Sequence, residues 1–145
     1  MDRSDALYDK LTKIDMLLSH GDRLIWQQFN LSEVRYYTLV HLSENPGISL
    51  SGLAERLLCT KGNATRVIQG MESDGLVLRQ VDENDSRALQ LFLTDAGEAL
   101  LAKASEALAT YNHQRFACLT FESQASFQQN LEVLRTHLTA LLETD

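Results

Sequence analysis

Proline and long apolar runs are scarce in this sequence. The 145 residues include a single proline, Pro46, so almost the whole chain is free to form helices. Charged residues interrupt every apolar run well before the roughly 18 residues that a membrane span needs. The opening stretch, MDRSDALYDK, lacks the apolar segment of a signal peptide. The sequence therefore predicts a cytoplasmic, mainly helical protein without a membrane segment.

Patterns typical of catalytic and metal sites are also missing from the sequence. The two cysteines are expected to be reduced thiols, and the four histidines are widely spaced without a metal-ligand pattern around them. The sequence contains no Gly-rich phosphate loop, nucleophile elbow or paired-carboxylate arrangement. Cys59 is interpreted as a small apolar residue rather than a redox sensor, and Cys118 as a residue packed within a helix. We therefore expect no enzyme activity, no cofactor and no bound metal.

Positive charge is in deficit. The formal net charge is −7, which is unfavourable for a DNA-binding protein because phosphate neutralisation provides much of the affinity. Residues 55–90 carry five basic and six acidic residues, whereas the rest of the chain carries eight basic and fourteen acidic ones. The local field at a contact surface matters more than the total charge. The charge lowers the expected non-specific affinity for DNA but does not exclude DNA as a partner.

Two short helical patterns lie between Leu53 and Gly75. Apolar residues recur at helical spacing in both, at Leu53, Ala54, Leu57 and Leu58 and then at Val67, Ile68 and Met71. Thr60 can cap the second helix with its hydroxyl, and Gly75 can end that helix in the left-handed conformation. The second helix begins with polar residues, namely Lys61, Asn63, Thr65 and Arg66. This arrangement predicts a helix-turn-helix whose second helix enters the DNA major groove.

The periodicity changes to that of strands after Gly75. Residues 76–81 and 88–93 form two short runs with partial alternation, separated by the polar and charged segment 82–87. A β-hairpin directly after a helix-turn-helix is the winged-helix arrangement. Arg87 is the only basic residue of the predicted tip, and it is the residue expected to enter the narrow, negative minor groove.

Apolar helical patterns flank this region on both sides. Residues 4–29, with a bend or break at Gly21, and residues 32–43 precede it, and Ile48 is expected in a very short strand. Residues 95–118 and 123–142 follow it, and the outer helices are more apolar than a small monomer needs. We expect a mainly α chain with a small β-hairpin wing. In it, residues 1–30 and 98–145 form dimerisation helices around a winged helix-turn-helix at 31–97.

Five motifs between Leu53 and Leu100 resemble those of the MarR family of bacterial transcription regulators. They are Leu53-Ala54-Glu55-Arg56-Leu57, Thr65-Arg66, Asp74-Gly75-Leu76-Val77, Asp85-Ser86-Arg87 and Leu93-Thr94-Asp95-Ala96-Gly97. Their spacing agrees with that of the family, and the flanking helices fit its layout, so the resemblance covers most of the chain. It implies a homodimeric transcription repressor that binds an approximately palindromic operator in double-stranded DNA.

The resemblance also implies which residues contact DNA. Those at or near the major groove would be Lys61, Asn63, Thr65 and Arg66. Arg87 would lie in the minor groove, and Asp85 would orient it through an ion pair. Many members of the family have two adjacent arginines in the wing, whereas Ser86 occupies the first of these positions here. We therefore expect weaker phosphate contact from this wing.

Side chains on the first two predicted helices suggest a site for a small effector. The candidates are Trp26, Arg35, Tyr36, Tyr37 and His41. An aromatic wall with cationic or titratable groups would suit a small aromatic or phenolic acid, as in many family members. The alternative is that these rings complete the core and that the protein has no ligand.

A second class of function stays open at this point. Winged helices also serve as protein-interaction modules, and an acidic chain suits that role. Lys61 and Arg66 would then be ordinary solvated helix charges. The polar start of the recognition helix together with Arg87 favours DNA, because a protein-binding module needs neither.

Overall fold

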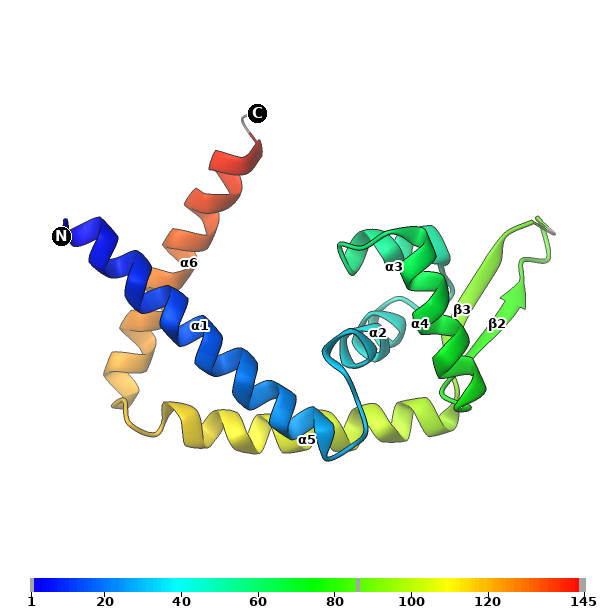
Figure 1. Cartoon of the computed structure of the whole chain (residues 1–145), viewed down its shortest axis with the longest axis horizontal. Coiled ribbons are helices and arrows are strands. Elements are labelled where there is room, and N and C mark those ends of the chain that lie inside the picture. The colour runs from blue at the N-terminus through cyan, green and yellow to red at the C-terminus, as the bar shows by residue number, and fades with distance from the viewer. Residues whose placement is uncertain (1, 86, 144–145) are drawn as a thin grey trace. The chain divides into compact units, whose positions relative to one another are not determined.

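The computed structural model describes residues 2–85 and 87–143. These residues form the following elements: α1 (Arg3–Gln27), α2 (Glu33–Glu44), β1 (Ile48–Ser49), α3 (Leu50–Arg56), α4 (Lys61–Ser73), β2 (Val77–Val81), β3 (Leu89–Leu93), α5 (Asp95–Phe116) and α6 (Phe121–Glu143). Figure 1 shows them along the chain. The chain divides into two compact units, Met1–Leu108 and Ala109–Asp145. Within the described part of the chain, no helix is both long and apolar enough to span a membrane.

Side-chain caps fix where the helices begin. The hydroxyl of Ser49 accepts a hydrogen bond from the backbone N–H of Gly52 at the start of α3, and that of Thr60 accepts from Asn63 at the start of α4, at 3.0 and 3.2 Å. The Thr60 cap was predicted from the sequence and is confirmed. Of the bend or break predicted at Gly21, the break is wrong, since α1 continues through that residue, and the bend stays a prediction. A glycine inside a helix costs only about 1 kcal/mol, which a helix of 25 residues can absorb.

The wing is an antiparallel sheet of three strands in the order β1-β3-β2. Val77 pairs with Leu93 and Val81 with Leu89, so the predicted hairpin is confirmed. The short strand predicted at Ile48 is also confirmed, and it pairs with Leu91 of β3. This third strand joins the base of the wing to the segment that leads into α3.

The core of the first unit draws on every element that surrounds the helix-turn-helix. Its buried hydrophobic residues are Trp26, Leu31, Tyr36, Leu39, Leu42, Leu53, Ala54, Ala64, Ile68, Met71, Val77, Leu91 and Ala104. The ring of Trp26 stacks on that of Tyr36 with centroids 4.9 Å apart. These residues come from α1 and the loop after it, from α2, α3 and α4, from the sheet and from the first half of α5, so burial of one cluster positions α4. The predicted fold class, mainly α with a small winged helix-turn-helix, is confirmed.

The end of α4 meets the wing and α5 at a tight turn. Gly75 has a positive φ of 74°, as predicted for the residue that ends this helix. The backbone N–H of Leu76 donates to the carbonyl of Met71 at 2.9 Å. The hydroxyl of Thr94 donates to the carbonyl of Gly75 at 2.6 Å and accepts from the backbone N–H of Gly97 at 3.1 Å. One hydroxyl thus fixes both the end of α4 and the start of α5.

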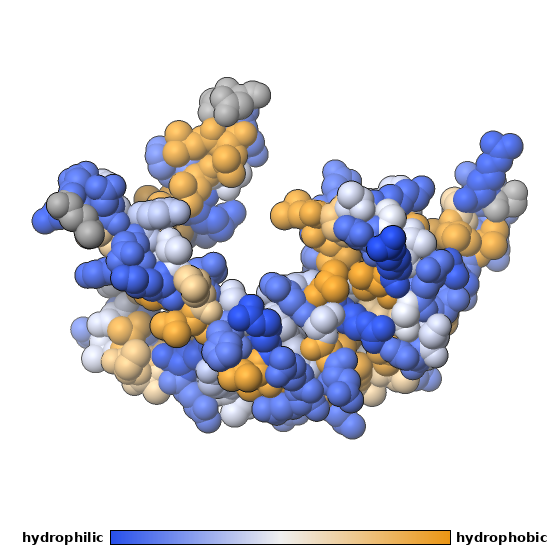
Figure 2. Space-filling view, viewed as in Figure 1, coloured by the Kyte–Doolittle hydropathy of each residue, from blue (hydrophilic) through white to orange (hydrophobic). Residues whose placement is uncertain are grey.

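The second unit contains the end of α5 and the whole of α6. None of the described residues of α6 is buried. Its exposed large apolar residues are Phe121, Phe127, Leu131, Val133, Leu138, Leu141 and Leu142, and Figure 2 shows hydrophobic surface over the C-terminal part of this helix. Cys118, predicted to pack within a helix, is instead exposed in the turn after α5, because that helix ends at Phe116.

Leu58 has an unusual conformation in the turn between α3 and α4. Its φ is 53°, a left-handed value that leucine rarely adopts, and its side chain is 94% exposed. The backbone N–H of Leu58 donates to the carbonyl of Glu55 at 3.2 Å, and that of Cys59 donates to the carbonyl of Ala54 at 3.0 Å. This pattern ends a helix tightly and usually places glycine or asparagine at the position of Leu58.

We therefore expect the Leu58→Gly substitution to stabilise the protein. It removes a Cβ that clashes in the left-handed conformation and loses little buried surface, so the gain should be about 1 kcal/mol in the free energy of unfolding. Chemical denaturation followed by circular dichroism measures this change. Leu58→Ala is the matched control, because it removes the same exposed side chain but keeps the Cβ. A Leu58→Gly variant no more stable than Leu58→Ala would show that the turn holds no strain.

Candidate nucleic-acid interface

Helix α4, predicted to be the recognition helix, has one apolar and one polar face. Ala64, Ile68 and Met71 are buried in the core of the first unit. Lys61, Asn63 and Arg66 are exposed, and Thr65 is half-buried. Figure 1 shows α4 next to the hairpin of β2 and β3. Burial of the apolar face therefore holds the polar residues of the first half of α4 toward solvent, on the same element and next to the wing.

Local hydrogen bonds limit what the side chains at the start of α4 can offer a ligand. The hydroxyl of Thr65 donates to the backbone carbonyl of Lys61 at 2.8 Å. Its hydrogen is thus engaged, and Thr65 has an acceptor lone pair and a methyl group to offer. The helix dipole adds partial positive charge at the same end of α4, where Lys61 is the first helical residue.

Charges are distributed unevenly along α4. In the described part of the chain, neither Lys61 nor Arg66 has a carboxylate partner. The acid in the second half, Glu72, accepts two hydrogen bonds from Arg79 of β2 at 2.6 and 3.1 Å. These hydrogen bonds, with the positive charge of Arg79, hold the pKa of Glu72 below its usual value. The positive potential is therefore concentrated at the first half of the helix.

The wing tip is organised by aspartate side chains. A carboxylate oxygen of Asp85 accepts from the backbone N–H of Arg87 at 3.0 Å, and one of Asp82 accepts from that of Asn84 at 2.9 Å. The side chain of Arg87 is exposed. Asp85 thus supports the backbone of Arg87, whereas the ion pair between their side chains stays a prediction. Ser86, expected to weaken phosphate contact, lies outside the described residues.

The DNA-contact residues predicted from the sequence leave out one residue on the exposed polar face of α4. Gln69 is exposed and lies three residues after Arg66, a spacing that places both on one side of a helix. Its amide has two donors and one acceptor oxygen, the groups that pair with base edges. The three-residue spacing from Arg66 was the signal available in the sequence.

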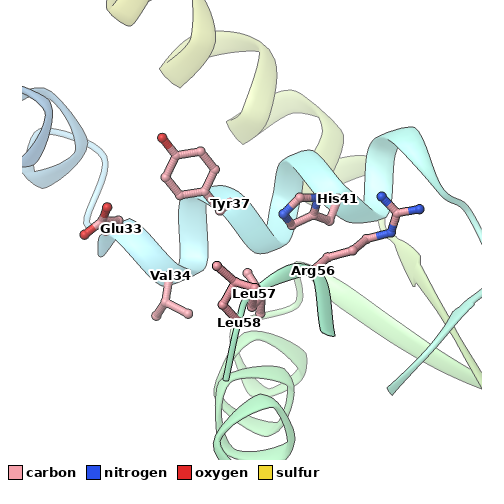
Figure 3. Close-up of a pocket in the computed structure, with 7 residues that line it drawn as sticks. All are labelled: Glu33, Val34, Tyr37, His41, Arg56, Leu57 and Leu58. Atoms are coloured by element: carbon pink, nitrogen blue, oxygen red, sulfur yellow. The ribbon is translucent and has the colours of Figure 1, made fainter. Parts of the chain in front are cut away.

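A cavity of about 480 Å³ lies beside α2. It is lined by Glu33, Val34, Tyr37, His41, Arg56, Leu57 and Leu58. Figure 3 shows the first four on α2 and the other three at the end of α3 and in the turn that follows it. Two of the five predicted effector residues, Tyr37 and His41, therefore line it. Arg56 and the leucines were not predicted, because they approach α2 only in the folded chain.

Two polar side chains of this cavity, Tyr37 and His41, have groups that can form hydrogen bonds. Burial, followed by the negative charges of Asp22 and Glu33, raises the pKa of the Tyr37 phenol. Its hydroxyl therefore stays protonated at neutral pH and can donate a hydrogen bond. The Nδ1 atom of His41 is buried without a hydrogen-bond partner among the described residues. An acidic ligand would find hydrogen-bonding groups here, beside the guanidinium of Arg56.

The other three predicted effector residues lie elsewhere in the first unit. Trp26 and Tyr36 are buried in the core, and the hydroxyl of Tyr36 lies 3.3 Å from that of Ser105. Arg35 forms an ion pair with Asp74 at 2.6 Å. Contact of these three with an effector stays a prediction. Among the described residues, no three His, Cys, Asp or Glu side chains are placed to hold a metal ion.

Comparisons with known proteins agree with this geometry. The sequence model of the MarR family matches residues 31–89. The homoprotocatechuate degradative operon repressor of Escherichia coli is 33% identical over 110 residues, which cover 76% of this chain and 74% of that protein. Among solved structures, a MarR-like transcription regulator from Bacillus cereus superposes with a TM-score of 0.81 at 25% identity, covering 93% of this chain and 97% of the other.

A solved complex has the same fold. The transcriptional repressor CouR, bound to a 23-mer DNA duplex, superposes with a TM-score of 0.79 at 23% identity, covering 91% of this chain and 94% of that one. The match to the E. coli repressor extends well beyond the winged helix-turn-helix. The chain therefore belongs to the MarR family, and it is a DNA-binding transcriptional regulator rather than an enzyme.

Proposed function

We propose that this regulator is a cytoplasmic homodimer that represses transcription by binding an approximately palindromic operator. The residues that would contact the major groove are Lys61, Asn63, Thr65 and Arg66, and Arg87 would enter the minor groove. One observation carries the proposal. The first half of α4 exposes cations that have no carboxylate partner among the described residues, opposite a buried apolar face and next to a wing that exposes Arg87.

Each residue type suits the contact assigned to it. The guanidinium of Arg66 can donate two hydrogen bonds to a guanine, and the amide of Asn63 can pair with an adenine. Lys61, at the positive end of the helix dipole, suits a phosphate. Arg87 on the wing suits the narrow minor groove, where the potential is most negative. A protein-interaction module would need none of these groups, and family membership further favours DNA.

The dimer is proposed from the apolar surface of the outer helices. In the first unit, α1 exposes Leu7, Tyr8, Ile14, Met16, Leu17 and Leu24. In the second unit, every described residue of α6 is at least partly exposed although the helix is rich in leucine and phenylalanine. Exposed apolar surface of this extent marks an interface. We assign residues 1–30 and 98–145 to dimerisation and residues 31–97 to the DNA-reading head.

Removing the two arginines should weaken DNA binding in different ways. Arg66→Ala should lower affinity for the cognate operator by about 1–3 kcal/mol, because a base contact is lost. Arg87→Ala should weaken binding to most sequences. Fluorescence anisotropy at several salt concentrations, with an operator obtained by in vitro selection and a scrambled duplex, measures both effects. Lys103→Ala, which removes an exposed charge from α5, is the control. Wild-type affinity in both arginine variants would contradict their placement.

The outer helices should hold two copies together in solution. Sedimentation velocity at micromolar concentration is expected to show a dimer. Leu138→Glu should shift the protein toward monomer, since it would bury an unpaired carboxylate in the interface. Gln129→Glu adds the same charge at another exposed position of α6 and serves as a comparison for the effect of charge alone. A wild-type monomer at this concentration would remove the dimer from the proposal.

A small aromatic or phenolic acid is the proposed effector. The cavity beside α2 is of about 480 Å³, within the range of small-molecule sites. Tyr37 offers a hydroxyl, and His41 and Arg56 suit a carboxylate. An operator presents its half-sites roughly 34–36 Å apart, so a ligand that favours a different spacing of the two heads would lower DNA affinity. The size of this effect is limited by the ligand's preference between the two spacings.

Calorimetry with a panel of phenolic acids tests this control. At least one acid should bind, and its binding should be weaker in the presence of operator DNA, because the coupling between two ligands is reciprocal. Replacing His41 with alanine should lower the affinity for the acid more than the affinity for the operator. Should no acid bind, or should operator leave acid binding unchanged, the effector proposal is wrong and the DNA proposal stands.

A further inference from the structure

One long-range ion pair joins α2 to the end of the recognition helix. Nη1 of Arg35 lies 2.6 Å from a carboxylate oxygen of Asp74, and the two residues are 39 positions apart in the sequence. Asp74 is the residue at which α4 ends. The side chains are 29% and 54% exposed, and ion pairs at such sites contribute little to the free energy of unfolding. Stability alone therefore gives a poor reason for this contact.

A glycine makes room for the guanidinium. Gly70 lies four residues before Asp74, on the same side of α4. A Cβ at Gly70 would lie 2.7 Å from Nη2 of Arg35, closer than real Cβ contacts allow. Glycine is a poor residue for the interior of a helix, and here its missing side chain leaves the space that the Arg35 guanidinium occupies. We call Arg35, Gly70 and Asp74 the Arg35 clamp.

The clamp restricts a motion that apolar packing does not. Ile68 and Met71 bury α4 against the core, but hydrophobic contact has no preferred direction and allows a helix to turn or slide slightly. A charge-assisted hydrogen bond from a planar guanidinium has a preferred geometry. The contact of Glu72 with Arg79 ties the same half of α4 to β2. Ion pairs to two different elements thus fix the second half of α4, while the first half carries the polar face.

We propose that Arg35 is a positioning residue for DNA recognition, acting through Gly70 and Asp74 to fix the orientation in which α4 presents Asn63 and Arg66 to the operator. This rests on the proposed role of α4 in reading DNA. Base contacts depend on the orientation of the helix more than phosphate contacts do, because hydrogen bonds to base edges are directional. Loss of the clamp therefore lowers affinity for the operator more than affinity for unrelated DNA.

Three variants that change the charge differently test the clamp. Arg35→Ala removes a positive charge, Asp74→Asn removes a negative charge, and Gly70→Ala changes no charge but displaces the guanidinium. The readout is the ratio of affinities for the selected operator and a scrambled duplex of equal length, measured by anisotropy. Each variant should lower this ratio by about three- to tenfold, and the Arg35→Ala/Asp74→Asn double variant should lose no more than the larger single loss. Ser73→Ala, an exposed neighbour outside the clamp, should keep the wild-type ratio.

Thermal unfolding of the same variants separates positioning from folding. Gly70→Ala should melt no lower than wild type, because alanine favours the helix and only the end of a flexible side chain must move. A ratio that stays within about twofold of wild type in all three variants overturns the proposal. The proposal is also overturned if Arg35→Ala and Asp74→Asn change the affinity for both duplexes in opposite directions and leave the ratio unchanged. That result would reflect only the opposite charges that the two substitutions remove. If Arg66→Ala also leaves the ratio unchanged, DNA reading by α4 itself is wrong.

Discussion

The burial of one face of α4 is the constraint on which the candidate interface depends. Ala64, Ile68 and Met71 enter a core that α1, α2, α3, the sheet and α5 share. Because residues three and four apart lie on the same side of a helix, burying these three leaves Asn63 and Arg66 on the opposite side. A polar substitution at Ile68 would therefore affect both the folding of the first unit and the direction in which the recognition surface points.

Local sequence rules predicted most of the fold because local contacts determine most of it. Thr60 caps α4 through a residue three positions away, and the hairpin strands are neighbours in the chain. The start of α5 follows from Thr94 in the same way. The polar face of α4 was also predictable, since it is the complement of an apolar pattern with helical period.

The features that sequence reasoning missed depend on contacts between distant segments or on context. Arg35, assigned to an effector site from its neighbours on the helix, has its partner at Asp74. The approach of Arg56 and Leu57 to Tyr37 requires α3 to pack on α2. The left-handed conformation of Leu58 was equally hidden, because that position at a helix end ordinarily has glycine or asparagine.

The two halves of α4 differ in how their substitution affects the rest of the molecule. The second half and the turn after it contain the ion pairs of Glu72 and Asp74 and the hydrogen bonds that link Gly75 to Thr94. The exposed side chains of the first half have few ties within the chain. If the first half of α4 reads the operator as proposed, a descendant of this protein could acquire a new operator by exchanging two or three surface residues while inheriting its scaffold unchanged. Gene duplication would then yield regulators that share one architecture and control different promoters.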